Sequence, residues 1–346
     1  MKITIISSYG PRTLGGLGTF TRDLIFELKK HAKVKSIYQI NNEDTENTIL
    51  QKLIFSLNCI RKLSKDRPDI IYAYGGWYIS LPIVIYKKIF PSVKIAYIHH
   101  TDPDYRLKGI KKLTFECILS QFDINIFVSK YLKRRLSYYN ITSDKYIINS
   151  GISINNAKPS DINKYKSKFN LDNITLSYIN NFKWQRKSEG AITLIKSITI
   201  VLKKHNVKLI IIGNGPYRMK AEDIVKKLKL TKNVLFVGEV ANSIIALASS
   251  DIFIHITYQD AFPIVILEAM AQKKPVIVSQ GYASNEIIKD GFNGLLTKNY
   301  PSAIASKIIS LIENKNLASI LASNGYATAN NYKWAYIIKK YLNLFK

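Results

Sequence analysis

Residues 251–271 read DIFIHITYQDAFPIVILEAMA, and this stretch predicts a strand, a loop and a helix in succession. Residues 251–256 are a short, apolar, β-prone run. Pro263 suits the first turn of a helix, because the N–H that proline lacks has no helical partner there. Asp260 therefore falls on a strand-to-helix loop, and Glu268 falls inside the helix that follows it. The helix rises about 7.5 Å between Pro263 and Glu268.

The two acids of this stretch have two interpretations. In the functional one, Asp260 and Glu268 bind hydroxyl groups at the two ends of a nucleotide diphosphate sugar, because the helical rise of about 7.5 Å matches the span from sugar to ribose. The free N–H groups and partial positive charge of the helix start would then face the diphosphate. In the structural interpretation, Asp260 caps the helix and Glu268 is a solvated surface residue.

The rest of the chain alternates β-prone runs with amphipathic helical patterns, which predicts parallel sheets covered by helices. A chain of 346 residues is long enough for two domains. The polar stretch at residues 155–172 separates two such series, so we expect one domain over residues 1–155 and another over residues 156–328. The remaining residues, 329–346, have helical periodicity and predict a terminal helix.

Several motifs together resemble the retaining glycosyltransferases of the GT-B fold, in the large family four of group 1 type. That family carries a Glu, seven residues, and a second Glu followed by Ala-Met-Ala. Here Asp260 precedes Glu268 at this spacing, and Ala269–Ala271 follow it. Residues 274–279 and 286–296 resemble the downstream strand and loop of the family. The first acid is one methylene shorter than in the family, which leaves the identity of the donor sugar open.

The resemblance runs along nearly the whole chain and carries expectations of its own. It implies two Rossmann-like βαβ domains that face each other across a cleft. The first would bind the acceptor and the second the nucleotide sugar, and the terminal helix would cross back to the first. The implied activity is a metal-independent, retaining transfer of a hexose from a UDP- or GDP-sugar to a glycan or lipid-linked acceptor. No cofactor is implied, because the nucleotide sugar is a co-substrate.

The resemblance also implies a set of site residues. Glu268 would hold the ribose and Asp260 the donor sugar, while His99, which ends the apolar run KIAYIH, would contact the sugar near the reacting carbon. The departing diphosphate would be stabilised by the backbone of Phe262, Pro263, Ile264 and Val265 together with Lys187. The other matched positions are Gly16 and Gly213 in glycine-rich loops, Val237 beside the nucleobase, and Lys183 or Arg186 in place of a family arginine that is Asn181 here.

Most of these features also have a structural interpretation. Glycine pairs often mark ordinary turns, and a basic run is often a solvated surface. His99 and His100 lie close in sequence to Asp102 and Asp104, but no further Cys or His cluster completes a metal site. We therefore expect no metal ion. The Asp-Pro-Asp string is interpreted as part of an acceptor-side loop.

The composition is strongly basic, with 51 Lys and Arg against 24 Asp and Glu and a formal net charge of +27. Basic clusters at residues 106–113 and 131–139 are interleaved with Leu and Tyr. Such clusters favour docking on the anionic inner leaflet of a membrane, and enrichment of Lys across the whole proteome is the alternative. No run approaches the about 20 apolar residues of a membrane span. No signal-peptide pattern is present, and only two cysteines occur, so a cytoplasmic location is expected.

Other functional classes account for less of the sequence. A nucleic-acid-binding protein would use the same positive charge, but no recognised module is present, so no nucleic-acid partner is expected. A nicotinamide dehydrogenase is disfavoured because the third glycine of its fingerprint would fall at Thr21. A phosphorylase or a nucleotide-sugar epimerase of the GT-B fold is the closest competitor, and a phosphorylase would need a cofactor lysine pocket that the sequence does not reveal.

Overall fold

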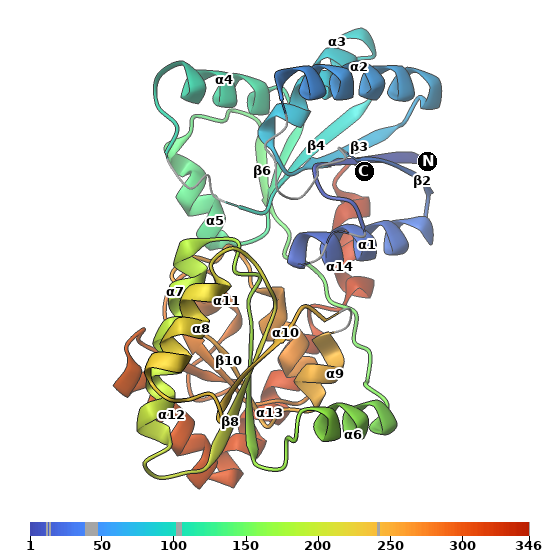
Figure 1. The fold of residues 1–346 in the computed structure, drawn as a ribbon. Coiled ribbons are helices and arrows are strands. Elements are labelled where there is room, and N and C mark those ends of the chain that lie inside the picture. Colours follow the sequence, from blue (N-terminus) through green and yellow to red (C-terminus); the bar gives the residue numbers. More distant parts are fainter. Residues whose placement is uncertain (12, 14, 39–47, 102–105, 241–242, 346) are drawn as a thin grey trace. The chain divides into compact units, whose positions relative to one another are not determined.

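The computed structural model describes residues 1–11, 13, 15–38, 48–101, 106–240 and 243–345. The chain divides into two compact units, and each holds one six-stranded sheet whose strand pairs are parallel (Figure 1). The first unit comprises Met1–Gly151 and Trp334–Lys346, and the second comprises Ile152–Lys333. This architecture confirms the predicted pair of Rossmann-like α/β domains.

The sheet of the first unit has the strand order β2-β1-β3-β4-β5-β6. Its strands are β1 (Lys2–Ser7), β2 (Lys33–Tyr38), β3 (Ile70–Tyr74), β4 (Lys94–His99), β5 (Ile124–Phe127) and β6 (Asp144–Ile147). Its helices are α1 (Gly16–Lys29), α2 (Ile49–Asp66), η1 (Trp77–Ile79), α3 (Ser80–Ile89), α4 (Gly109–Ser120), α5 (Lys130–Arg135), η2 (Leu136–Tyr138) and α14 (Trp334–Asn343). In the described part of the chain, no helix combines the length and apolar character needed to cross a bilayer.

The sheet of the second unit has the strand order β12-β11-β10-β7-β8-β9. Its strands are β7 (Ile174–Ile179), β8 (Val207–Ile212), β9 (Val234–Gly238), β10 (Ile252–His255), β11 (Val276–Ser279) and β12 (Leu295–Thr297). Its helices are α6 (Pro159–Lys168), α7 (Gln185–Val201), α8 (Arg218–Lys227), α9 (Ser243–Ala248), α10 (Ile264–Ala271), α11 (Ser284–Ile287), α12 (Pro301–Glu313) and α13 (Lys315–Asn330).

Helices cover both faces of each sheet, which is why most strands are buried along their whole length. In the first unit, α2, α3 and α4 lie on one face, and α1 and α14 lie on the other (Figure 1). Helix α14 buries Trp334, Ile337, Ile338 and Tyr341, the face that its periodicity predicts. The hydroxyl of Tyr72 on β3 donates to the carbonyl of Tyr341 at 2.7 Å, so α14 belongs to the core of the first unit.

His99 ends β4 and His100 follows it, and both rings pack against aromatic side chains of the first unit. The ring of His99 stacks on Phe127 with centroids 4.5 Å apart, and its Nε2 lies 2.7 Å from Oδ1 of Asn125. The ring of His100 packs on the other side, 4.2 Å from Phe20 and 5.5 Å from Tyr74. Its Nε2 is buried and has no hydrogen-bond partner within the described residues. Burial therefore disfavours the charged form of both rings.

A close backbone contact joins α7 to β10 in the second unit. Gly190 is buried in α7, and a Cβ at this position would overlap the carbonyl oxygen of Ile256, the residue that follows β10. This proximity also brings the hydroxyl of Tyr178 on β7 within 2.9 Å of the same carbonyl, to which it donates. The ends of β7 and β10 are thus held together by backbone packing and by a buried hydrogen bond.

We expect Gly190→Ala to destabilise the protein by roughly 2 kcal/mol or more, because α7 must move away from β10 to admit the methyl group. Urea unfolding of the full chain measures this free energy. The matched control is Gly16→Ala at the start of α1, where a Cβ meets nothing within 4 Å. The control is expected to be neutral or slightly stabilising. Equal stability of the two variants would contradict the contact.

The two buried histidines should make the stability of the first unit depend on pH. Burial lowers the pKa of His99 from 6.5 to about 4 and that of His100 from 6.5 to about 3. The unfolded chain therefore takes up protons first as the pH falls. The stabilisation is complete above about pH 6.5 and is lost below it, by up to roughly 1.4 kcal/mol per pH unit for each ring.

We expect His100→Phe to reduce this acid sensitivity, because phenylalanine fills the space beside Phe20 and Tyr74 without a titrating nitrogen. Urea unfolding at a series of pH values between about 6 and about 4 measures the slope. Near pH 8 both rings are neutral, and the variant should be about as stable as the wild type. The same slope in both proteins would show that His100 does not contribute.

Candidate active site

The predicted strand, loop and helix around Asp260 are present as β10, a connecting loop and α10. Asp260 lies on the loop, and its Oδ2 is 3.2 Å from Nε2 of His255, the last residue of β10. Both side chains are about nine-tenths buried. The other ring nitrogen of His255 is also buried and has no partner in the described part of the chain. His255 therefore fixes the carboxylate of Asp260 at the strand end, a role that the sequence analysis did not assign.

Asp260 does not occupy the N-cap position of α10. Pro263 is the N-cap residue, and it makes no side-chain cap hydrogen bond. The helix begins one residue after the predicted position, at Ile264. Phe262 and Pro263 are buried in front of it, and Ile264 and Val265 form its first turn, half-buried. The N–H groups of this turn have no partner within the helix, so the turn can accept an anion.

Glu268 lies one turn further along α10 and is half-buried, so it is not the fully solvated residue of the structural interpretation. The hydroxyl of Ser243, at the start of α9, lies 3.4 Å from its Oε2. A carboxylate held beside a hydroxyl can accept further hydrogen bonds from a ligand, because ionised carboxylates offer about four acceptor sites. Asp260 thus lies on the loop before α10, and Glu268 lies in the second turn of that helix.

The basic segment after β7 leads into the N-terminus of α7. Lys183 is exposed in the loop, and Arg186 is exposed in the first turn of the helix, which contains no acidic residue. Lys187 follows in the same turn, and its side chain lies outside what the structure describes. Cations at a helix N-terminus oppose the helix dipole at a cost of about 0.3–1 kcal/mol each. Such a local conflict is typical of a site that receives an anion.

The glycine pair after β8 has a packing role. A Cβ on Gly213 would overlap the carbonyl oxygen of Asn180, and one on Gly215 would overlap that of Asn181, so both glycines admit the loop that follows β7. The N–H of Gly213 donates to the carbonyl of Gly238 at 2.8 Å, which ties this loop to β9. Val237 on β9 is half-buried. Contacts of Gly213 and Val237 with a nucleotide remain predictions.

These segments meet at one edge of the second sheet. The chain adds β8 and β9 on one side of β7, and then β10, β11 and β12 on the other side. The strand order therefore reverses between β7 and β10, and ligands of open α/β sheets bind outside the carboxyl ends of strands at such a reversal. The loop with Lys183 follows β7, and the loop with Asp260 follows β10. The sheet thus brings the loops that carry Lys183 and Asp260 to the same edge.

The predicted residues of the first unit have a different character. Gly16 is the exposed first residue of α1, in the loop after β1, where the strand order reverses between β1 and β3. His99 is buried, with its Nε2 at Asn125 and one face on Phe127, which favours a packing role. The donor contact of His99 therefore stays a prediction. Asp102 and Asp104 lie outside the described residues.

The titratable side chains of the site are few. Within the described residues, no three His, Cys, Asp or Glu side chains gather as a metal site requires. His255 and Asp260 form a pair, and their neighbour Tyr178 donates to a backbone carbonyl. Burial and the nearby Asp260 raise the pKa of Tyr178 well above 10, so its hydroxyl remains a hydrogen-bond donor. The carboxylates at this edge can accept hydrogen bonds from hydroxyl groups, and the N–H groups and cations can bind an anion.

Known proteins share both the sequence pattern and the fold. Residues 160–328 match the family model of the glycosyl transferases group 1. An uncharacterized glycosyltransferase of Methanocaldococcus jannaschii is 26% identical and is aligned over 100% of this chain and 98% of its own. The alpha-monoglucosyldiacylglycerol synthase of Streptococcus pneumoniae is 24% identical over 86% of this chain and 75% of its own.

A solved structure gives the same result for the fold. The structure of HepE from Anabaena in complex with UDP-glucose has a TM-score of 0.82 to this chain at 19% identity, and the match covers 100% of this chain and 99% of that one. This likeness extends the GT-B fold over both units. Residues 160–328 therefore belong to the group 1 glycosyltransferases, and the chain is a glycosyltransferase with the GT-B fold.

Proposed function

We propose that this glycosyltransferase moves a hexose from a UDP- or GDP-sugar to a hydroxyl of a glycan or lipid-linked acceptor, with retention and without a metal ion. The observation that carries the proposal is the pair of acids around the N-terminal half of α10. Asp260 is fixed by His255 at one end, and Glu268 lies beside Ser243 at the other. The helix start between them offers N–H groups to a diphosphate.

The charges around this edge suit a nucleotide diphosphate sugar. In the proposal, Glu268 accepts hydrogen bonds from the ribose hydroxyls, and Asp260 accepts them from the donor sugar. Lys183, Arg186 and Lys187 attract the diphosphate. Their positive charge stabilises the transition state most, because negative charge builds up on the departing diphosphate as the glycosidic bond breaks. Glycine-supported packing of the loop after β7 keeps the cations near this place.

Two relatives support parts of the proposal through their names. HepE has been solved with UDP-glucose, which supports a nucleotide sugar as donor. The Streptococcus pneumoniae relative is a synthase of a glucosyl diacylglycerol, which supports a lipid-linked acceptor.

The transfer proposed here needs no nucleophile from the enzyme. The acceptor oxygen forms a bond to the anomeric carbon on the face from which the diphosphate leaves, and the bond between that carbon and the diphosphate oxygen breaks with its electron pair. The acceptor proton passes to a diphosphate oxygen. The enzyme supplies orientation and charge stabilisation, which are the two contributions that the residues around α10 offer.

A panel of UDP-, GDP- and ADP-sugars tests the proposal, with thermal shift to detect binding and mass spectrometry to identify products. Release of the nucleoside diphosphate with a new glycoside, undiminished by EDTA, is expected. Conversion of one nucleotide sugar into its epimer, or phosphate-dependent release of a sugar phosphate, would favour the two competing activities of this fold instead.

We expect Glu268→Ala to reduce kcat/KM by about 30-fold or more, which corresponds to roughly 2 kcal/mol of lost transition-state stabilisation. The reason is the loss of the ribose contact beside Ser243. Initial rates with the best donor of the panel measure the effect. The matched control is Asp223→Ala, an exposed acid on α8, which should leave the rate unchanged. A near-normal rate for Glu268→Ala would reject the assignment of the site.

We expect Asp260→Glu to change the preference among donor sugars by about tenfold, since a misplacement of about 1 Å at a reacting substrate is costly. The longer side chain restores the acid typical of the family but displaces the carboxylate from His255. Rates with the donor panel measure the preference, and titration with the free nucleoside diphosphate provides the control, because its affinity should stay the same. An equal loss for all sugars and for the nucleotide would indicate a damaged site instead.

A further inference from the structure

Helix α2 has an exposed apolar stripe that its packing does not explain. Leu50, Leu53, Ile54 and Leu57 follow the spacing i, i+3, i+4 and i+7, so they share one face of the helix. This face points to solvent, and the exposed fraction of the four side chains lies between 49% and 69%. The buried residues of the helix, Cys59 and Leu63, belong to the opposite face. Soluble helices normally show the reverse pattern, with polar residues outside.

Helices α3 and α4 repeat this arrangement. On α3, Leu81, Ile85 and Ile89 are spaced by four residues and are exposed. On α4, Ile110 and Leu113 are spaced by three residues and are 80% and 64% exposed. Each stripe faces solvent, away from the sheet that the helix covers.

The three helices lie side by side on one face of the first unit, with α3 packed against both α2 and α4 (Figure 1). Their stripes therefore lie on the same side of the first unit, which we call the α2–α4 face. Exposed apolar stripes gathered on one side are rare on proteins without a binding partner for them. The second unit contains exposed apolar residues such as Met219 and Ile320, but these stand singly on different helices.

The α2–α4 face is also basic. Helix α2 contains four Lys or Arg residues, and α3 and α4 contain two each, against one acid in α2 and one in α4. Both acids are already paired with lysines: Asp66 with Lys35, and Glu116 with Lys112. Arg61 and Lys65 continue the apolar stripe of α2 toward its C-terminus and are exposed. Lys87 of α3 is likewise paired, with Asp123, so it and Lys112 add little charge to the surface. The other cations of the three helices give the face its positive charge beside the exposed alkyl groups.

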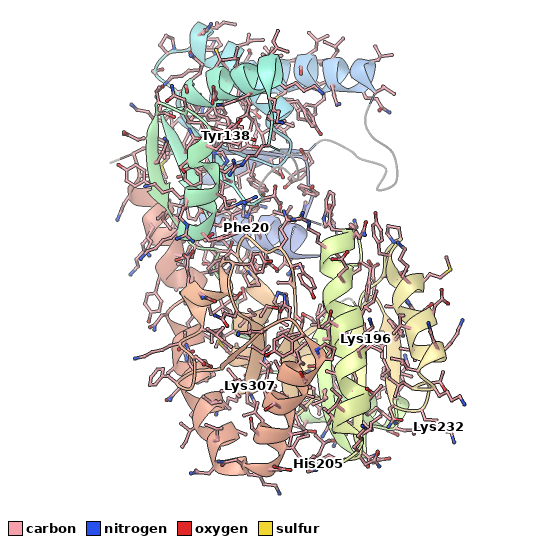
Figure 2. All side chains as sticks on the ribbon, turned by 90° about the vertical axis from the view of Figure 1, so that its left-hand side faces the viewer. Phe20, Tyr138, Lys196, His205, Lys232 and Lys307 are labelled. Carbon is pink, nitrogen blue, oxygen red and sulfur yellow. The ribbon has the colours of Figure 1, made fainter. Side chains whose placement is uncertain are left out.

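An aromatic ring lies beside α4, next to the apolar stripes. Tyr138 is exposed (Figure 2). The cations of Arg106 and Lys112 lie 4.8 and 4.3 Å from its ring centre. Tyrosine with adjacent cations is typical of residues at a membrane interface, where one end is apolar and the other is hydrated. The basic cluster at residues 131–139 contributes little else, because Leu132 and Leu136 are buried. The apolar half of the predicted membrane surface is therefore on α2–α4.

We propose that the α2–α4 face docks on the surface of an anionic lipid bilayer. A second copy of the chain would meet this face with the same positive charge, which opposes association. An anionic bilayer instead offers negative headgroups for the lysines and arginines and an acyl region for the leucines and isoleucines. Short side chains in stripes along surface helices insert only to the headgroup boundary, so the protein binds the bilayer without crossing it.

Vesicle flotation of the full chain tests the proposal. We expect the wild type to float with vesicles of phosphatidylcholine and phosphatidylglycerol and to remain in the dense fraction with phosphatidylcholine alone. Leu53→Ser combined with Leu57→Ser should weaken binding to the anionic vesicles by about tenfold or more. Arg61→Gln combined with Lys65→Gln should weaken it similarly. High salt should reduce the difference from the wild type, because wild-type binding also declines there.

Matched controls come from the second unit. Met219→Ser with Ile320→Ser removes two exposed apolar side chains elsewhere, and Lys226→Gln with Lys227→Gln removes two exposed cations. Both controls should bind like the wild type. Circular dichroism and urea unfolding check that all variants fold, which is expected because the altered side chains are exposed.

Equal flotation of the wild type with both vesicle types would overturn the proposal. So would variants of the α2–α4 face that bind anionic vesicles as strongly as the wild type does. Self-association of the wild type that the Leu53→Ser, Leu57→Ser variant abolishes, without any binding to vesicles, would identify a second copy as the occupant instead. None of these measurements needs a nucleotide sugar or turnover. Failure of the docking surface is therefore distinguishable from failure of the proposed activity.

Discussion

One constraint of parallel sheets determines the candidate site: the carboxyl ends of all strands lie at the same edge of the sheet. In the second sheet, the strand order reverses once, between β7 and β10. The helices that follow these two strands, α7 and α10, cover opposite faces of the sheet (Figure 1). Their loops therefore diverge, and the N-termini of both helices meet the same edge. The bond from Tyr178 to the carbonyl of Ile256 and the missing Cβ of Gly190 keep the two strand ends together while the loops separate.

Much of this arrangement was predictable because its signals are local. The apolar run before Asp260, the proline at residue 263 and the helical spacing of the next residues predict a strand, a loop and a helix without knowledge of any distant contact. The alternation of such units predicts parallel sheets, and the buried face of α14 follows from a period of 3.6 residues. The position of Asp260 at the carboxyl end of a strand follows from the same local reasoning.

The partners of these residues were not predictable, because they depend on how separate segments fold back. The spacing of His255 and Asp260 does not reveal that the intervening loop returns the carboxylate to the ring. Likewise, the resemblance assigns Gly213 to donor binding, and the sequence does not reveal that Gly213 and Gly215 admit the backbone of a neighbouring loop. His99 ends a strand, as ligand residues often do, yet Asn125 and Phe127, which lie together on the next strand, occupy its ring. Sequence indicates which residues reach an edge, and packing decides what they contact there.

The net charge of +27 illustrates the same distinction on the surface. The number of charged residues does not distinguish a basic binding surface from a general enrichment in lysine. The positions of the charged residues on the structure do. In the second unit, Lys196 lies on α7, Lys307 on α12 and Lys232 in the loop before β9 (Figure 2). On α2, by contrast, Arg61 and Lys65 extend a stripe of leucines that the fold leaves exposed. Exposed leucine on a basic helix contributes nothing to the stability of this unit, so its presence points to a function outside the fold.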